Sequence, residues 1–136
     1  MKVFLCASRS NYHRVPAIQR ELGRRGHVVT LPNNFDDPDR ERRIKSSAPG
    51  EYREWKSRML EMQREKVRAN DAVLVLNFDK GESRNYLGGA TFLEVFKAWE
   101  LGRRIFFFNP LPDGILRDEL DAMSPVVIHG DLDLVS

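Results

Sequence analysis

The sequence is poor in the residues that build disulfides and metal sites. It has one cysteine, Cys6, and three histidines, His13, His27 and His129. A lone cysteine cannot form an internal disulfide, so nothing in the sequence implies an oxidising compartment. The histidines are not spaced as metal ligands are, and Cys6 has no partner cysteine. We therefore expect no metal and no cofactor.

Long apolar runs and a strong charge of one sign are also missing. The apolar stretch near the N-terminus extends over only about six residues, too few for a signal-peptide core or a membrane span. The chain carries 22 basic and 20 acidic residues, a net charge of +2. This excess is too small to indicate binding to nucleic acid or to an anionic membrane surface. We expect a cytoplasmic protein with no nucleic-acid partner and no membrane partner.

What the sequence does contain is short apolar runs separated by amphipathic stretches. This alternation is typical of βαβ units around a parallel sheet. The predicted strands cover residues 3–7, 27–31, 71–76, 104–108 and 126–128. A length of 136 residues is usual for one domain. We therefore predict a single α/β domain over residues 1–136, doubly wound in the Rossmann or flavodoxin-like manner, with a mainly parallel sheet of about five strands.

Apolar residues at three- and four-residue spacing predict the helices between these strands. The predicted helices cover residues 15–22, 51–68, 88–101 and 113–123. Residues 32–50 are predicted to form a long loop with a short helical turn, and loops of this length often act as functional lids. Tyr52, Trp55, Met59 and Met62 form one face of the second helix. We interpret this face as core, with a substrate-facing role for Tyr52 or Trp55 as the alternative.

Polar loops follow three of the predicted strands, at residues 8–11, 77–89 and 109–110. In an open parallel sheet, ligands bind beyond the carboxyl ends of the strands. We therefore expect the first two loops to contribute to a common pocket. The candidate binding residues are Ser8, Arg9, Asn11, Asn77, Asn85, Tyr86, Gly88, Gly89, Thr91 and Asn109.

The helix after the second loop carries the candidate catalytic group. Gly88 and Gly89 let the backbone approach a ligand closely, and the free N–H groups at the start of a helix favour a phosphate or a carboxylate. Glu94 lies one to two turns into this segment, with Thr91 roughly on its face. From spacing alone, its carboxylate is either exposed to solvent or held in a pocket.

The first loop has two interpretations of similar weight. Ser8, Arg9 and the N–H groups of the next helix together could bind a phosphate. Alternatively, Ser10 or Asn11 could be an ordinary N-cap of that helix.

Residues 69–76 and 88–105 form a longer pattern. An Ala-Asn-Asp sequence enters an apolar strand, and a Gly-Gly turn is followed by Glu94 on a helix, by small residues, and by Gly-Arg-Arg-Ile before the next strand. This pattern resembles the nucleoside 2-deoxyribosyltransferase superfamily. Residues 4–9, Phe-Leu-Cys-Ala-Ser-Arg, resemble the first strand and loop of its deoxynucleoside 5′-monophosphate N-glycosidase branch. Segments similar to a microbial branch of the superfamily are residues 75–79, 85–89 and 108–112.

The resemblance implies an enzyme that acts on a small-molecule nucleoside or nucleotide. It implies that Glu94 is the nucleophile that attacks the anomeric carbon, and a carboxylate there would stabilise an oxocarbenium-like centre. It also implies a second catalytic carboxylate on the helix before the third strand, where Glu61 and Glu65 lie. Ser8 and Arg9 are implied to lie near the sugar or the 5′-phosphate. The superfamily further implies a homodimer or a higher homo-oligomer.

Two other functions fit the same residues. Residues 88–94 also resemble the Gly-Gly-rich Thr-x-x-Glu motif of lysine-decarboxylase-like phosphoribohydrolases, which release a base from a nucleoside monophosphate. A nucleotide-binding or sensing module without turnover is the third hypothesis.

Overall fold

The strands form one five-stranded sheet in which every neighbouring pair is parallel. A computed structural model describes residues 1–136, and the strand order is β2-β1-β3-β4-β5. The strands are β1 (Lys2–Cys6), β2 (Val28–Thr30), β3 (Ala72–Val75), β4 (Arg104–Phe107) and β5 (Val126–Val127). The predicted α/β class and the doubly wound, parallel sheet are therefore confirmed.

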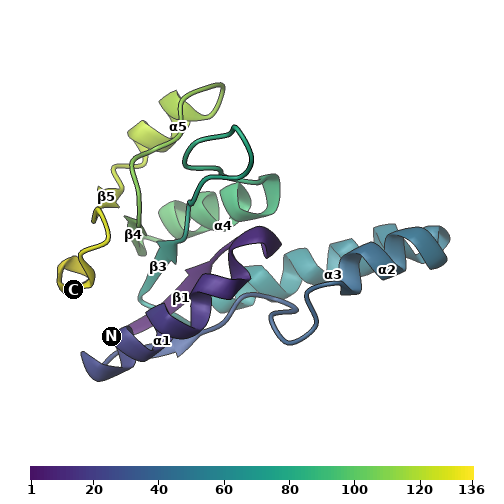
Figure 1. The fold of residues 1–136 in the computed structure, drawn as a ribbon, viewed down its shortest axis with the longest axis horizontal. Coiled ribbons are helices and arrows are strands. Elements are labelled where there is room, and N and C mark those ends of the chain that lie inside the picture. The colour runs from purple at the N-terminus through teal and green to yellow at the C-terminus, as the bar shows by residue number, and fades with distance from the viewer.

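Helices cover both faces of the sheet (Figure 1). They are α1 (Val15–Arg24), α2 (Arg40–Ser47), α3 (Pro49–Arg68), α4 (Gly89–Glu100) and α5 (Arg117–Ala122), with 3₁₀ helices at Arg9–Arg14 and Leu132–Leu134. Side chains of β1 alternate between two buried clusters, because successive residues of a strand point to opposite faces. Val3 and Leu5 pack with α1 and the C-terminal segment, whereas Phe4 and Cys6 pack with α3, α4 and α5.

The chain reverses its direction across the sheet next to β1. From β1 it passes through α1 to β2 at one edge, and it then returns past β1 to β3 and continues to β5 at the other edge. Ligands of open α/β sheets bind beyond the carboxyl ends of the strands at such a switch point. Here that point lies between the ends of β1 and β3. Asn11 joins the two ends, because its Nδ2 donates a hydrogen bond to the carbonyl oxygen of Leu76 at 2.9 Å.

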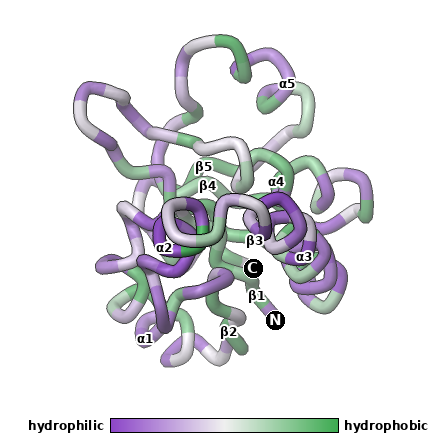
Figure 2. The backbone as a smooth tube through the Cα atoms, turned by 90° about the vertical axis from the view of Figure 1, so that its right-hand side faces the viewer, coloured by the Kyte–Doolittle hydropathy of each residue, from purple (hydrophilic) through white to green (hydrophobic).

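The structure differs from the predicted elements mainly before α3. The predicted long loop contains the eight-residue helix α2, and a 3₁₀ helix occupies Arg9–Arg14 where a loop was expected to lead into α1. No residue of α2 is buried, so the helix lacks the apolar periodicity from which helices are predicted. Figure 1 shows α2 lying alongside the N-terminal half of α3. In Figure 2, α2 is mostly hydrophilic, whereas the strands at the centre of the molecule are mostly hydrophobic.

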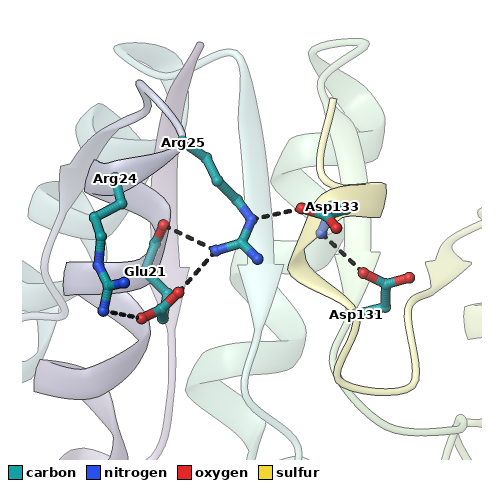
Figure 3. A network of polar contacts seen from close by, with 5 residues as sticks. All are labelled: Glu21, Arg24, Arg25, Asp131 and Asp133. Carbon is teal, nitrogen blue, oxygen red and sulfur yellow. Dashed lines mark hydrogen bonds and ion pairs between the residues drawn. The ribbon is translucent and has the colours of Figure 1, made fainter.

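The C-terminal segment is fixed to the end of α1 by charged side chains (Figure 3). Nε of Arg25 donates a hydrogen bond to Oδ1 of Asp133 at 2.7 Å, and its Nη1 lies 2.9 Å from Oε2 of Glu21. This arrangement holds the last 3₁₀ helix over the face of the sheet that α1 covers.

None of the helices combines the length and the apolar character needed to cross a lipid bilayer.

Candidate functional site

A cavity of about 580 Å³ lies at the carboxyl end of β1, beside the switch point. Its walls come from the loop after β1, from residues 32–45, from one face of α3, and from the first turns of α4. Pockets for small-molecule ligands measure roughly 300–1,000 Å³. The volume therefore suits a ligand as large as a nucleotide.

Glu94 lies in the wall of this cavity and is only 7% exposed. The buried residues of α4 are Thr91, Glu94, Val95 and Ala98, which recur at helical spacing and face the sheet and α3. Glu94 thus occupies a core position of an amphipathic helix, but near its N-terminal end, where the core opens into the cavity. The spacing left open whether the Glu94 carboxyl group is exposed to solvent or held in a pocket, and in the structure it lies in a pocket.

The surroundings of Glu94 favour a protonated carboxyl group in the empty cavity. Burial raises its pKa to about 8, although the thiol of Cys6 and the ammonium groups of Lys66 and Lys56 act in the opposite direction. No protein N–H or O–H group donates a hydrogen bond to this carboxyl group. A buried carboxyl group whose one close partner is the weakly donating thiol of Cys6 is costly, so a ligand that offers a donor or a positive charge would bind there favourably.

The loop after β1 contributes Ser8 and Arg9 to the cavity. The Ser8 hydroxyl lies 3.2 Å from that of Ser10, and it makes no capping bond to the following 3₁₀ helix. Nη1 of Arg9 forms an ion pair with Asp39 at 2.9 Å. Ser10 and Asn11 lie inside this 3₁₀ helix, so neither is its N-cap; the N-cap is Ser8, whose hydroxyl makes no capping bond and remains beside the cavity.

The turn before α4 contributes Tyr86 and Gly88 to the cavity, and the first turn of α4 contributes Gly89 and Thr91. Gly88 has the extended backbone of an N-cap, with φ −80° and ψ 167°. A Cβ at this position would lie 3.3 Å from the Tyr86 hydroxyl, so the missing side chain makes room for that ring. Lys80 lies on the ring as well, with its Nζ 4.7 Å from the ring centroid.

The remaining candidate binding residues lie outside this cavity. Asn11 and Asn77 are buried and connect loops, since Asn77 Nδ2 donates hydrogen bonds to the carbonyl oxygens of Asn109 and Pro110 at 3.0 and 2.8 Å. Asn85 and Asn109 line a separate, more open hollow of about 790 Å³. The structure thus groups six of the ten candidates around the cavity that Glu94 lines, and it gives Asn11 and Asn77 a structural role.

The structure does not bring Glu61 or Glu65 to the cavity. Both side chains are exposed on α3, and Glu65 pairs with Arg68. The helical register is the reason, because the face of α3 that lines the cavity carries Trp55, Met59 and Gln63, and residues 61 and 65 point elsewhere.

Instead, the second carboxylate in the cavity wall belongs to Glu41 of α2. Its Oε1 accepts hydrogen bonds from the Tyr52 hydroxyl at 2.7 Å and from Lys56 Nζ at 3.0 Å. Partial burial alone would raise the pKa of Glu41, but these two hydrogen bonds and the charges of Lys56 and Lys45 lower it. The carboxyl group is therefore ionised at neutral pH. No sequence signal marks Glu41, since α2 was not predicted.

Tyr12 is another cavity residue that sequence reasoning missed. Its hydroxyl donates a hydrogen bond to the carbonyl oxygen of Asn33 at 2.7 Å. Burial raises the pKa of Tyr12 to about 12, and the carboxyl groups of Glu94 and Glu41 add to this shift. The phenol therefore stays protonated and lies within electrostatic reach of both acids.

No group of three or more His, Cys, Asp or Glu side chains is arranged to hold a metal ion. In comparisons with known proteins, no family model matches the chain, and no curated sequence is significantly similar to it.

Proposed function

We propose that this protein cleaves the N-glycosidic bond of a nucleoside or nucleotide, or transfers the sugar to another base, with Glu94 as the nucleophile. The observation that carries the proposal is the position of the Glu94 carboxyl group. It is buried, accepts no hydrogen bond from a nitrogen or oxygen donor, and lines a cavity of about 580 Å³. A carboxylate in such surroundings stabilises positive charge on a sugar ring far more strongly than an exposed one does.

In the first step, one Glu94 oxygen forms a bond to the anomeric carbon as the carbon–nitrogen bond to the base breaks. The electron pair of that bond leaves with the base, which takes up a proton from solvent water. In the second step, water or a second base attacks the same carbon, and the ester bond to Glu94 breaks to restore the carboxylate. Lys66 and Lys56 favour the ionised form that this sequence requires.

The charge of the cavity wall favours a nucleotide over a nucleoside. Arg9, Lys45, Lys56 and Lys80 line it, against the carboxyl groups of Glu41 and Glu94. A 5′-phosphate would therefore enter a region with an excess of cations, and Arg9 can bind it with two parallel hydrogen bonds.

Glu41 is the carboxylate that we assign to the second step, in place of Glu61 or Glu65. It is ionised, lines the same cavity as Glu94, and is held in place by Tyr52 and Lys56. A carboxylate so fixed can accept the proton of an attacking water molecule.

The experiment is a search for free base by chromatography after incubation with nucleosides and their 5′-monophosphates. Release that is lost in Glu94→Gln, with binding retained, supports the proposal. Exchange of one base for another identifies a transferase, whereas release of the base into water alone identifies a hydrolase, either an N-glycosidase or the phosphoribohydrolase alternative. Binding without release contradicts an enzyme and supports the sensing module, and thermal shift detects it because ligand at 100 times its dissociation constant adds about 2.7 kcal/mol to the free energy of unfolding.

We also propose that a second copy of the chain covers an apolar face of α3 and α4. Leu60, Leu93, Phe96 and Trp99 are exposed there, and Trp99 retains 52% of its surface. The rings of Phe96 and Trp99 lie 5.8 Å apart. Contiguous exposed aromatic and aliphatic residues of this kind mark interaction surfaces, and a homodimer would bury them.

A further inference from the structure

Two polar side chains besides Glu94 are buried in the cavity wall. Gln63 of α3 is 7% exposed and Thr91 of α4 is 5% exposed, and both line the same cavity as Glu94. Thr91 precedes Glu94 by one helical turn on the same face. Polar groups are rarely buried at a cavity unless they have partners or bind a ligand.

The orientation of the Gln63 amide is fixed by the first turn of α4. Its Nε2 donates a hydrogen bond to the carbonyl oxygen of Ala90 at 3.1 Å. Because a carbonyl oxygen can only accept, the nitrogen of the amide must face α4, and Oε1 is the free end. In an α-helix the carbonyl of residue 90 also accepts the N–H of residue 94. Gln63 is therefore anchored on the turn that carries Glu94.

Oε1 of Gln63 has no partner in the protein, and Gln63 lines both this cavity and a hollow of about 380 Å³ between α3 and α4. No N–H or O–H group donates to it. The buried polar side-chain atoms that lack a partner belong to Asn33, Trp55 and Arg103, and neither Gln63 nor Thr91 is among them. The amide oxygen thus remains available to a hydrogen-bond donor of a ligand.

The stereochemistry of a nucleoside indicates which of its hydroxyl groups could donate a hydrogen bond to Oε1 of Gln63. In a β-nucleoside the base lies on one face of the sugar ring and the 2′-hydroxyl on the other. A nucleophile that displaces the base in line approaches from the face opposite the base. The 2′-hydroxyl, on the carbon next to the anomeric centre, therefore faces the wall that carries Glu94 and its neighbour Gln63.

We propose that Oε1 of Gln63 accepts a hydrogen bond from the ribose 2′-hydroxyl and makes the protein selective for ribonucleosides or ribonucleotides over their 2′-deoxy counterparts. The inference rests on the proposed function. A 2′-deoxy sugar leaves the buried amide oxygen unpaired, which is the situation in which hydroxyl-binding sites reject analogues most strongly. Hydrogen bonds to this hydroxyl also strengthen as the transition state forms in glycosyl transfer.

The test compares kcat/KM for a ribonucleotide with that for the matching 2′-deoxyribonucleotide, in the natural protein and in Gln63→Met. Methionine has nearly the same length and shape but offers no amide oxygen. We expect the ribo-to-deoxy ratio to fall by about 10- to 100-fold in Gln63→Met. The greater intrinsic lability of the deoxy bond cancels, because the same two substrates are compared in both proteins.

Gln19→Met is the matched control, since Gln19 is half-buried on α1 and lies outside the cavity. We expect its ribo-to-deoxy ratio to equal that of the natural protein. If Gln63→Met does not fold, titration calorimetry of the natural protein still tests the inference. Ribose 5-phosphate should bind about tenfold or more tightly than 2-deoxyribose 5-phosphate.

The outcomes separate this inference from the function on which it rests. Base release with an unchanged ratio in Gln63→Met overturns the role of Gln63 and leaves the proposed function intact. Equal binding of the two sugar phosphates also overturns it. Selective binding of ribose 5-phosphate without base release from any substrate supports the 2′-hydroxyl site and contradicts the catalytic proposal.

Discussion

Nη1 of Arg9 lies 2.9 Å from Oδ1 of Asp39, and this ion pair joins the loop after β1 to the residue that precedes α2. Both side chains are largely exposed, so the pair itself adds little to stability, on the order of 0–1 kcal/mol. Arg9 lines the cavity whereas Asp39 does not. A phosphate bound in the cavity would therefore compete with Asp39 for the guanidinium group.

This competition predicts opposite effects for the two partners. Arg9→Ala should weaken 5′-monophosphate binding by about tenfold or more and leave the corresponding nucleoside nearly unaffected, because a charge-assisted hydrogen bond is lost only with the nucleotide. Asp39→Asn frees Arg9 and should tighten 5′-monophosphate binding by a few-fold. Titration calorimetry measures both, and equal losses of nucleotide and nucleoside binding in Arg9→Ala would exclude Arg9 as the phosphate ligand.

The second prediction concerns the pH dependence of base release. Glu94 must be ionised to attack, and its pKa in the free protein is raised to about 8 by burial. The kcat/KM for base release should therefore rise about tenfold per pH unit below pH 8 and level off above it. Initial rates between pH 5.5 and pH 9.5 measure this profile. A rate that falls as the pH rises through 8 would mean that Glu94 acts as a proton donor.

The raised pKa also predicts a pH-dependent stability. The unfolded carboxyl group has the ordinary pKa of 4.5, and the folded one about 8. The stability that comes from keeping Glu94 neutral is fully present below pH 4.5 and is lost as the pH rises through about 8, at about 1.4 kcal/mol per pH unit in this range. Glu94→Gln cannot ionise, so it should match the natural protein at pH 4.5 and exceed its free energy of unfolding at pH 8.5.

Urea denaturation at the two pH values provides the measurement, and Glu65→Gln is the control because Glu65 is exposed. Its free energy of unfolding should follow that of the natural protein at both pH values. A Glu94→Gln variant that is equally or less stable at pH 8.5 would show that the carboxyl group is not destabilised by burial.

The choice among the acidic residues makes a fourth prediction. Glu41→Gln should lower the rate of hydrolysis by about 10²–10⁴-fold, the usual contribution of a general base. Glu61→Gln and Glu65→Gln should leave it unchanged, because neither side chain lines the cavity. Single-turnover measurements of base release and of sugar release separate the two chemical steps. If Glu65→Gln loses as much activity as Glu41→Gln, Glu65 of α3 and not Glu41 alone acts in catalysis, which contradicts the assignment.

The fifth prediction concerns the apolar face of α3 and α4. Trp99→Glu places a charge on the exposed aromatic pair and should convert a dimer into a monomer, which sedimentation velocity detects. Ile115→Glu is a suitable control, because Ile115 is 95% exposed and lies apart from this face. A natural protein that sediments as a monomer at micromolar concentration would contradict the proposed interface.

The sequence predicts those parts of the fold that leave an apolar pattern. The runs at β1, β3 and β4 are continuous and buried, and α1 repeats Val15, Ile18 and Leu22 toward the sheet. Local hydropathy determines such elements, so they can be recognised without knowledge of the rest of the chain. Helix α2 could not be recognised in this way, because it buries none of its residues.

The cavity was predictable only in part, for a related reason. The loops after β1 and before α4 meet because parallel strands bring their carboxyl ends to one edge. Glu41 and Gln63, by contrast, enter the cavity through the packing of α2 and α3 against that edge. Spacing marks Trp55 and Met59 as part of the inward face of α3, but it wrongly adds Met62, which is exposed. It does not show that Gln63 lies on this face or that the face borders a cavity. Asn11 and Asn77 were predicted to bind a ligand because they follow strands, but their side chains form hydrogen bonds with the backbone of neighbouring segments instead.

Because α2 has no buried side chains, it contributes to the lining of the cavity without contributing to the buried core. Ligand binding and stability often depend on the same residues, but in this helix they do not. Glu41 and Lys45 are the residues of this helix that line the cavity. Exchanging the other seven residues of this helix, with Glu41 kept, should alter which molecules the cavity accepts while the melting temperature hardly moves. The set of ligands that the cavity accepts can therefore change through one surface helix, while the sheet and Glu94 stay the same.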